Sequence, residues 1–203
     1  MRYPKLRELG EAVKSLFTKP YTSDFPGKPH VPHENFRGQP VFNPEKCLGC
    51  LACEEACPAG AIAHEDLTDP PDAAKRRMIH YTDTCIFCSQ CQAACIADHE
   101  GIELGNEWEL SYFDRTQASE SIELDLQLCE VCGTIIATKP HLAWLADRLD
   151  EMAFSNPTVY LARLKELGVA DDNIVPVLRD RGRSDRVKIL CVKCRRETTR
   201  YNE

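Results

Sequence analysis

The sequence has no long apolar segment. Its longest uninterrupted apolar runs are four or five residues, whereas a helix that crosses a bilayer needs about 20. The N-terminus carries charged residues from position 2 onward and lacks the continuous apolar stretch of a secretory signal peptide. We therefore expect no transmembrane helix and a cytoplasmic, reducing location for the chain.

Basic charge is scarce in the middle of the chain. Residues 41–113 are strongly acidic, residues 1–40 have a net positive charge, and residues 114–203 are nearly balanced. Nucleic-acid binding requires a basic face, so we expect no nucleic-acid partner. The distribution predicts three parts, which are an N-terminal arm (1–40), a central domain (41–115) and a C-terminal extension (116–203).

Cysteine, by contrast, is abundant. The 203 residues include 12 cysteines, and each belongs to a group. In a reducing compartment such a set is typical of metal ligands rather than of disulfides. The groups are Cys47, Cys50, Cys53 and Cys57; Cys85, Cys88, Cys91 and Cys95; Cys129 and Cys132; and Cys191 and Cys194.

The two groups of four are copies of one unit, because adding 38 to each cysteine number of the first gives the second. Each copy reads C-x2-C-x2-C-x3-C, the signature of bacterial ferredoxins. There, three cysteines of one loop hold a 4Fe-4S cluster and the fourth crosses to the other cluster. We predict cluster one on Cys47, Cys50, Cys53 and Cys95, and cluster two on Cys85, Cys88, Cys91 and Cys57.

Zinc sites are the alternative for these eight cysteines. Zinc takes four ligands in two pairs, however, and its chemistry does not call for a third C-x2 step or a fourth cysteine after three residues. The second copy departs from the motif at Ile96, where a proline usually stands. The segment from Cys95 to Ile102 is also two residues longer than the segment from Cys57 to Ile62.

The stretch between the two copies predicts a β-hairpin. Residues 61–66 and 76–81 alternate as strands do, and the segment 68–75 between them is rich in turn residues. We therefore expect an α+β fold, a ferredoxin-like unit with an enlarged hairpin. His64 and His80 lie on these strands, and we expect them to be solvated or hydrogen-bonded, since both clusters already have four thiolates.

The N-terminal part predicts an amphipathic helix over residues 5–17, followed by a proline-rich extended arm. Apolar residues recur there at helical spacing, namely Leu6, Leu9, Val13, Leu16 and Phe17. One interpretation is docking on a partner subunit or on lipid headgroups. The other is packing on the chain's own domain.

The two remaining cysteine pairs predict a mononuclear metal site. Two C-x2-C knuckles place four thiolates around one tetrahedral ion, either zinc or a rubredoxin-like iron; two reactive dithiols or free thiols are the alternative. Each knuckle follows an apolar, strand-like run, and Gly133 allows a tight turn after the first. The insertion between the knuckles predicts two helices. The first has an inward stripe of Leu142, Leu145, Leu149 and Met152. The second begins at Asn156-Pro157, ends at Gly168 and has Tyr160, Leu164 and Leu167 inward.

Residues 14–115 resemble the two-cluster ferredoxin subunit shared by respiratory complex I and the membrane-bound nickel-iron hydrogenases. The discriminating parts are the Phe-Arg-Gly-x-Pro segment at residues 36–40 and the acidic, aromatic stretch at residues 102–115. The cysteine motif alone occurs in many ferredoxins. Residues 128–149 and 189–197 resemble the C-terminal extension of the equivalent subunit in formate hydrogenlyase and hydrogenase-4 complexes.

The resemblance implies an electron-transfer subunit without a catalytic residue of its own. It would act in a group 4 nickel-iron hydrogenase complex, peripheral to the cytoplasmic membrane, beside the nickel-iron large and small subunits and an electron-input subunit. A complex I type quinone reductase is the alternative, which the tail argues against. A third hypothesis is a nucleic-acid-binding zinc module with Arg195, Arg196 and Arg200 as phosphate contacts.

Overall fold

The computed structural model describes residues 5–20, 22, 24, 27–28, 30–170 and 188–199. The chain forms two compact units, Met1–Phe36 and Arg37–Glu203. In the first unit, helix α1 (Leu6–Phe17) lies where the periodicity predicted a helix. No residue of α1 is buried, and its five apolar side chains are all exposed.

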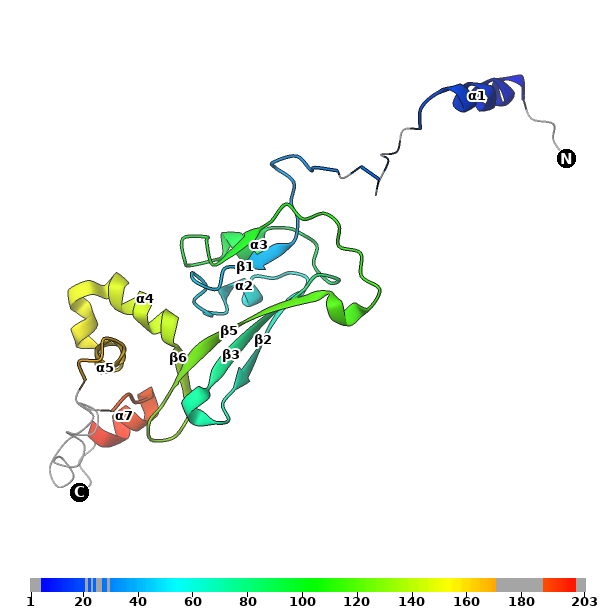
Figure 1. Cartoon of the computed structure of the whole chain (residues 1–203). Helices are drawn as coiled ribbons and strands as arrows, with labels where there is room; N and C mark the ends of the chain where they lie inside the picture. The colour runs from blue at the N-terminus through cyan, green and yellow to red at the C-terminus, as the bar shows by residue number, and fades with distance from the viewer. Residues whose placement is uncertain are drawn as a thin grey trace. The chain divides into compact units, whose positions relative to one another are not determined.

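The second unit is built on antiparallel strands. Strands β2 (Ile62–Leu67), β3 (Lys75–Tyr81), β5 (Ser119–Leu128) and β6 (Ile135–Thr138) form one sheet in the order β2-β3-β5-β6 (Figure 1). Strands β1 (Pro40–Phe42) and β4 (Ile102–Leu104) form a separate two-stranded ladder. The predicted hairpin is confirmed, because β2 pairs with β3 and the 3-10 turn η1 (Pro71–Ala73) lies between them.

Each cysteine motif contains one short helix at the same place. Helix α2 (Ala52–Glu55) follows Cys50, and helix α3 (Gln90–Ala93) follows Cys88. The two helices contact each other. The internal repeat read from the sequence is therefore a repeat of structure as well.

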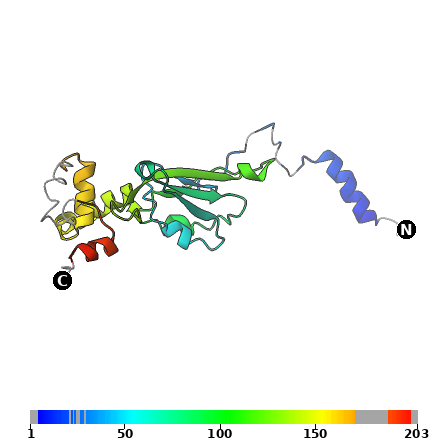
Figure 2. The ribbon, with the colours of Figure 1, turned by 90° about the horizontal axis from the view of Figure 1, so that it is seen from below.

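The C-terminal helices gather at one end of the sheet. Strand β5 begins after the short turn η2 (Arg115–Gln117), pairs with β3, and leads to β6 and α4 (Lys139–Leu149). Figure 2 shows α4, η3 (Asp150–Ser155), α5 (Pro157–Glu166) and α7 (Val192–Thr199) together beyond this end. One sheet thus spans the boundary predicted at residue 115.

The inward stripe predicted for the first inserted helix is wrong at its end. Leu142 is buried on α4, but Met152 is 69% exposed. The α-helix ends at Leu149 because Asp150 has a left-handed φ of 47°. Met152 therefore lies on the 3-10 helix η3, whose different angular spacing turns it out of the stripe.

The second inserted helix begins where the sequence predicted. Asn156 caps α5 by accepting a hydrogen bond from the Thr158 amide at 3.1 Å. Its predicted inward residues are partly wrong, since Leu167 lies beyond the last helical turn and is 59% exposed. The buried residues are instead Thr158, Val159 and Leu161.

The main core joins the sheet to the cysteine motifs. Its buried members come from β1, both motifs, the hairpin, β4 and β5; they are Phe42, Cys47, Cys53, Ile62, Met78, Cys91, Ile102 and Leu124. Two smaller clusters lie in the C-terminal part, one around Leu142 and one around Cys129. The cysteine motifs therefore lie within the largest core cluster rather than on a surface loop.

Candidate iron-sulfur and metal centres

The two cysteine loops share one backbone conformation. Gly49 and Phe87 stand at equivalent positions and have φ angles of 60° and 53°, and Leu51 and Ser89 have φ angles of 69° and 64°. A left-handed conformation is unfavourable for residues other than glycine and usually marks a functional loop. Both loops thus accept the same local strain in order to curve around a common centre.

Backbone amides face the cysteine sulfurs. The Ala61 amide donates to Cys57 Sγ at 3.2 Å, and the Phe87 amide donates to Cys85 Sγ at 3.4 Å. Such hydrogen bonds stabilise negative charge on a thiolate and on a cluster bound to it.

The fourth cysteine of the second motif lies beside the first motif. A Cβ placed on Gly101 would lie 2.9 Å from Cys95 Sγ and 3.4 Å from the Cys47 Cα, so only glycine fits between them. The chain reaches this point through Asp98 and His99, both left-handed, which belong to the segment that is two residues longer than its counterpart. Cys95 is therefore brought to Cys47.

The fourth cysteine of the first motif lies with the second motif. A small pocket is lined by Cys57, Cys85, Cys88 and Cys91, together with Pro40, Ile62 and His80 among others. The pocket thus brings the last cysteine of the first motif together with the first three cysteines of the second motif.

Burial makes these thiols poor acids in the absence of metal. Desolvation raises the pKa of Cys47 to about 11, of Cys53 to about 12 and of Cys91 to about 11. At pH 7 these groups are therefore neutral thiols, and binding of iron must displace their protons. Apolar surroundings of this kind suit a bound cluster, because they exclude water from it.

One face of β3 is directed at the cysteine motifs, and it was missed in the sequence. Arg76, Met78 and His80 alternate along the strand and are all buried. The guanidinium of Arg76 donates to the Gly49 carbonyl at 2.9 Å and forms two bonds of 2.7 and 2.8 Å with Asp66. Alternation in the strand was the available signal, but it does not say which face is buried.

Arg76 and Thr138 fix the loop of the first motif. The Arg76 hydrogen bonds hold the pKa of Asp66 below its ordinary value, so Asp66 stays ionised beside the guanidinium. Thr138 of β6 donates from its hydroxyl to the Leu48 carbonyl. Adjacent loop carbonyls are therefore held by two strands of the same sheet.

The two strand histidines differ. His64 Nδ1 lies 2.6 Å from Glu54 Oε2, which confirms the expected hydrogen-bonded role. The expectation for His80 is wrong, because its side chain is fully buried and neither ring nitrogen has a hydrogen-bond partner among the described residues. Burial also lowers the pKa of His80.

The remaining four cysteines converge on one point. The Sγ atoms of Cys129, Cys132, Cys191 and Cys194 all lie within 4.8 Å of one another. Four sulfurs bound to one zinc ion at about 2.3 Å lie about 3.8 Å apart in tetrahedral geometry. The arrangement therefore fits a single ion better than a cube, where each thiolate binds a different iron.

The knuckle has an acidic thiol and hydrogen bonds to its sulfurs. Hydrogen bonding with Thr134 lowers the pKa of the Cys132 thiol to about 6. The hydrogen bond between Cys194 and Cys132 raises the pKa of the Cys194 thiol to about 12. The Cys191 amide donates to Cys129 Sγ at 3.3 Å. Hydrogen bonds among these four cysteines stabilise negative charge on their sulfurs, and the thiolate is the form of cysteine that binds a metal ion.

The surroundings of the second knuckle differ from prediction. Strand β5 precedes the first knuckle as expected, and Gly133 makes the predicted turn with a φ of 71°. No strand precedes Cys191 within the described residues 188–190, however, and Cys194 lies in α7. The Leu190 carbonyl instead accepts from the hydroxyl of Thr158 on α5 at 2.9 Å.

The arginines of this region take part in the fold. The Arg195 guanidinium donates to the Thr158 hydroxyl at 2.6 Å. Arg196 also makes an interaction within the protein. Arg200, the third predicted phosphate contact, lies outside the described residues.

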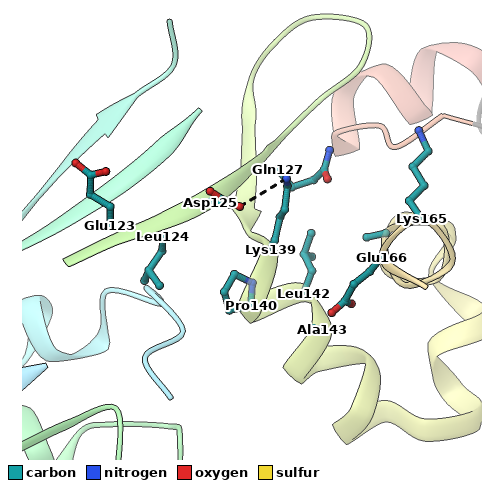
Figure 3. A pocket seen from close by; sticks show the side chains of 11 residues that line it. Glu123, Leu124, Asp125, Gln127, Lys139, Pro140, Leu142, Ala143, Lys165 and Glu166 are labelled. Atoms are coloured by element: carbon teal, nitrogen blue, oxygen red, sulfur yellow. Dashed lines mark ion pairs between the residues drawn. The ribbon is translucent and has the colours of Figure 1, made fainter. Parts of the chain in front are cut away.

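A separate pocket of about 770 Å³, with no cysteine among the described residues that line it, lies between β5 and helices α4 and α5. Figure 3 shows its mixed lining, with Lys139 directed at Asp125. The Lys139 Nζ atom lies 3.9 Å from Asp125 Oδ2. Its charged side chains belong to both signs, namely Glu123, Asp125, Glu166, Lys139 and Lys165.

All twelve cysteines, each of which is described, are free of disulfides.

Among the described residues, no helix is both long enough and apolar enough to pass through a bilayer.

Comparison with known proteins places this architecture among iron-sulfur subunits. The model of the 4Fe-4S binding domain matches residues 40–63. Formate hydrogenlyase subunit 6 of Escherichia coli is 33% identical over 130 residues, which cover 64% of this chain and 69% of that protein. NADH-quinone oxidoreductase subunit I 2 of Geobacter metallireducens is 32% identical over 121 residues, covering 57% and 90% respectively.

A third relative is similar to the same degree. NADH-quinone oxidoreductase subunit 9 of Thermus thermophilus is 33% identical over 148 residues, which cover 66% of this chain and 76% of that protein.

Proposed function

This chain belongs to the family of iron-sulfur subunits that includes formate hydrogenlyase subunit 6 and subunit I of NADH-quinone oxidoreductases, and we propose that it relays electrons through two 4Fe-4S clusters. Cluster one would be held by Cys47, Cys50, Cys53 and Cys95, and cluster two by Cys85, Cys88, Cys91 and Cys57. The clusters, when bound, would supply one-electron oxidation and reduction.

The observation that carries this proposal is the crossed grouping of the cysteines. Cys95 and Cys47 both lie next to Gly101, and Cys57 lines one pocket with Cys85, Cys88 and Cys91. Cys53 and Cys91 also belong to one buried core cluster. Two centres within one core suit electron transfer from one to the other.

The protein residues position and shield these centres. The left-handed loop residues curve the chain, the amides of Ala61 and Phe87 face the sulfurs, and the apolar core excludes water. Arg76 and Thr138 fix the loop of cluster one. A fixed loop keeps the reorganisation of the centre small when its charge changes.

We further propose a place in a membrane-bound hydrogenase complex of the formate hydrogenlyase type, at the cytoplasmic face of the membrane. The supporting feature is the C-terminal group of four cysteines, which resembles the extension of the hydrogenase subunit. Its partners would be the nickel-iron large and small subunits and an electron-input subunit. The equivalent subunit of a quinone reductase is the alternative, and relatives of both kinds match at nearly equal identity.

The C-terminal cysteines would bind one zinc ion with a structural role. Four thiolates around zinc have no accessible redox change, so this site would hold the tail together without carrying electrons. A mononuclear iron in the same place is the alternative, and it would add a third redox centre.

Metal analysis and complex isolation test the proposal. The chain purified anaerobically should contain about eight iron and about eight acid-labile sulfide, as two cubes require. A sulfide content near four, or none, would contradict two clusters. The native complex should contain nickel-iron subunits and evolve hydrogen; co-purifying quinone-reductase subunits without nickel would favour the alternative.

A further inference from the structure

His80 is a buried polar side chain without a protein partner. It lies on β3 with 0% of its surface exposed, and neither ring nitrogen has a hydrogen-bond partner among the described residues. Leaving a buried donor unpaired costs free energy, so such a group in a native protein requires an explanation. In either protonation state the imidazole ring carries at least one N–H donor.

The neighbours of His80 on the sheet do not meet this need. Its cross-strand neighbours are Ile62 on β2 and Glu120 on β5. Ile62 is apolar, and the Glu120 carboxylate, which accepts a hydrogen bond from Gln39 at 3.3 Å, makes none with either ring nitrogen of His80. The acceptor for His80 must therefore come from elsewhere.

The other polar groups next to His80 are the cysteines predicted to hold cluster two. His80 lines the same pocket as Cys57, Cys85, Cys88 and Cys91, and the rest of that lining is largely apolar. Thiolates and inorganic sulfides bound to iron accept hydrogen bonds, and such bonds are among the features that set a cluster's reduction potential.

The internal repeat supplies a built-in comparison. His80 stands five residues before Cys85, and the equivalent residue before Cys47 is Phe42. Phe42 is also buried, at 3% exposed, but it has no hydrogen-bond donor in its side chain. The two centres therefore differ at this position in polarity rather than in burial.

We propose that His80 is a positioning residue that donates a ring N–H hydrogen bond to the sulfurs of cluster two and thereby raises the reduction potential of that cluster. This inference rests on the proposed two-cluster function. Reduction adds one electron to the cluster and makes its sulfurs more negative, so a donor stabilises the reduced state more than the oxidised state. Phe42 exerts no such effect on cluster one.

The test compares three His80 variants with one control in the full chain, purified anaerobically with both clusters. Redox titration followed by electron paramagnetic resonance gives the reduction potential of each cluster. The signal of cluster two is identified as the one that the Cys85→Ser variant lacks. His80→Phe and His80→Leu remove the donor, whereas His80→Gln keeps an N–H. Met78→Leu changes another fully buried side chain on the same face of β3 and should not move the potential.

We expect His80→Phe and His80→Leu to lower the ratio of reduced to oxidised cluster two about tenfold at a fixed potential. For a one-electron couple this corresponds to a reduction potential lower by about 59 mV. His80→Gln should shift it less, and cluster one should not shift in any variant. An unchanged cluster-two potential in His80→Phe and His80→Leu would overturn the proposal. An equal shift in Met78→Leu would overturn it as well, since packing alone would then explain the effect.

A second measurement does not depend on how the variants fold. Wild-type chain labelled with 15N-histidine should show a weak 15N hyperfine coupling to reduced cluster two in pulsed paramagnetic resonance. Absence of this coupling would overturn the role of His80 even if the variants lose their clusters. A wild-type chain without eight iron and eight sulfide would instead contradict the proposed function itself, so the two failures are distinguishable.

Discussion

At the scale of single residues, the fourth cysteine of each motif decides how the two centres are linked. Cys95→Ser should damage the cluster held by Cys47, Cys50 and Cys53, because the Cys95 sulfur lies beside Cys47. Cys57→Ser should damage the other cluster, whose pocket includes Cys57. Each variant should lose up to about four of about eight iron atoms, measured by iron analysis and paramagnetic resonance.

The opposite pattern of spectral loss in these two variants would refute the crossed assignment. Ser89→Ala serves as the control, since Ser89 lies in the loop of the second motif but offers no thiolate. It should retain both signals.

Arg76 is a further residue whose removal should act on one centre only. Arg76→Met takes away the donor to the Gly49 carbonyl and both hydrogen bonds to the Asp66 carboxylate, which then faces only the ring of His64 at 3.9 Å among the described residues. The side chains of Arg76 and Asp66 are both largely buried. Breaking such a pair costs about 3 kcal/mol of stability. We expect a lower unfolding temperature and faster loss of cluster one than of cluster two, followed by optical and paramagnetic spectra.

Arg77→Met is the matched control, because Arg77 is the next residue of β3 but points to the other face. It forms only exposed pairs with Glu65 and Glu123, so its removal should have little effect. Equal loss of both clusters in Arg76→Met would contradict a specific role in the loop of cluster one.

At the scale of secondary-structure elements, the C-terminal group of four cysteines connects three segments that are distant in sequence. It joins the end of β5, the loop before α7 and, through the hydrogen bond from Thr158 to Leu190, the start of α5. If a metal ion is bound there as proposed, the stability of these elements would depend on it, because metal-binding free energy contributes to folding free energy.

Changing Cys132 and Cys194 together to Ser should therefore remove one bound metal ion and unfold the helices α4 and α5, while both clusters keep their spectra. Metal analysis and circular dichroism measure the two effects. Lys193→Ser, an exposed position between Cys191 and Cys194, should change neither. If the lost metal is iron with a rubredoxin-like spectrum, the structural interpretation fails; an unchanged metal content would exclude a mononuclear site.

At the scale of the whole molecule, the two compact units predict a division between docking and cluster binding. Gly38 donates to the Gly105 carbonyl at 2.9 Å, so the second unit is anchored from residue 37 onward. Deleting residues 1–36 should leave both clusters intact and abolish assembly with the partner subunits. Cluster content and co-purification of partners measure the two outcomes.

The exposed apolar residues of α1 provide a finer version of this test. Leu9→Ser with Val13→Ser should weaken assembly, whereas Glu11→Ser with Lys14→Ser, on the same helix, should not. Loss of the clusters together with assembly would instead indicate that the helix stabilises the chain's own domain.

The sequence by itself determined those features that depend on neighbouring residues. The cysteine spacing predicted two equivalent loops, because iron ligands must follow one another closely along a tight turn. Asn156-Pro157 predicted the start of α5, and the alternating runs around residues 68–75 predicted the hairpin. Caps, turns and short-range ligand spacing act within a few residues, so their physical causes are visible in the sequence.

The tertiary structure decided the features that depend on which surfaces meet. Alternation along β3 is equally compatible with burial of either face, and only packing against the cysteine loops directs Arg76 and His80 inward. The convergence of Cys132 and Cys191, whose sulfurs lie 3.6 Å apart across 59 positions, likewise depends on the folded elements between them. Met152 turns outward because the backbone changes at Asp150. Long-range packing selects among locally acceptable conformations, and local sequence patterns do not encode that selection.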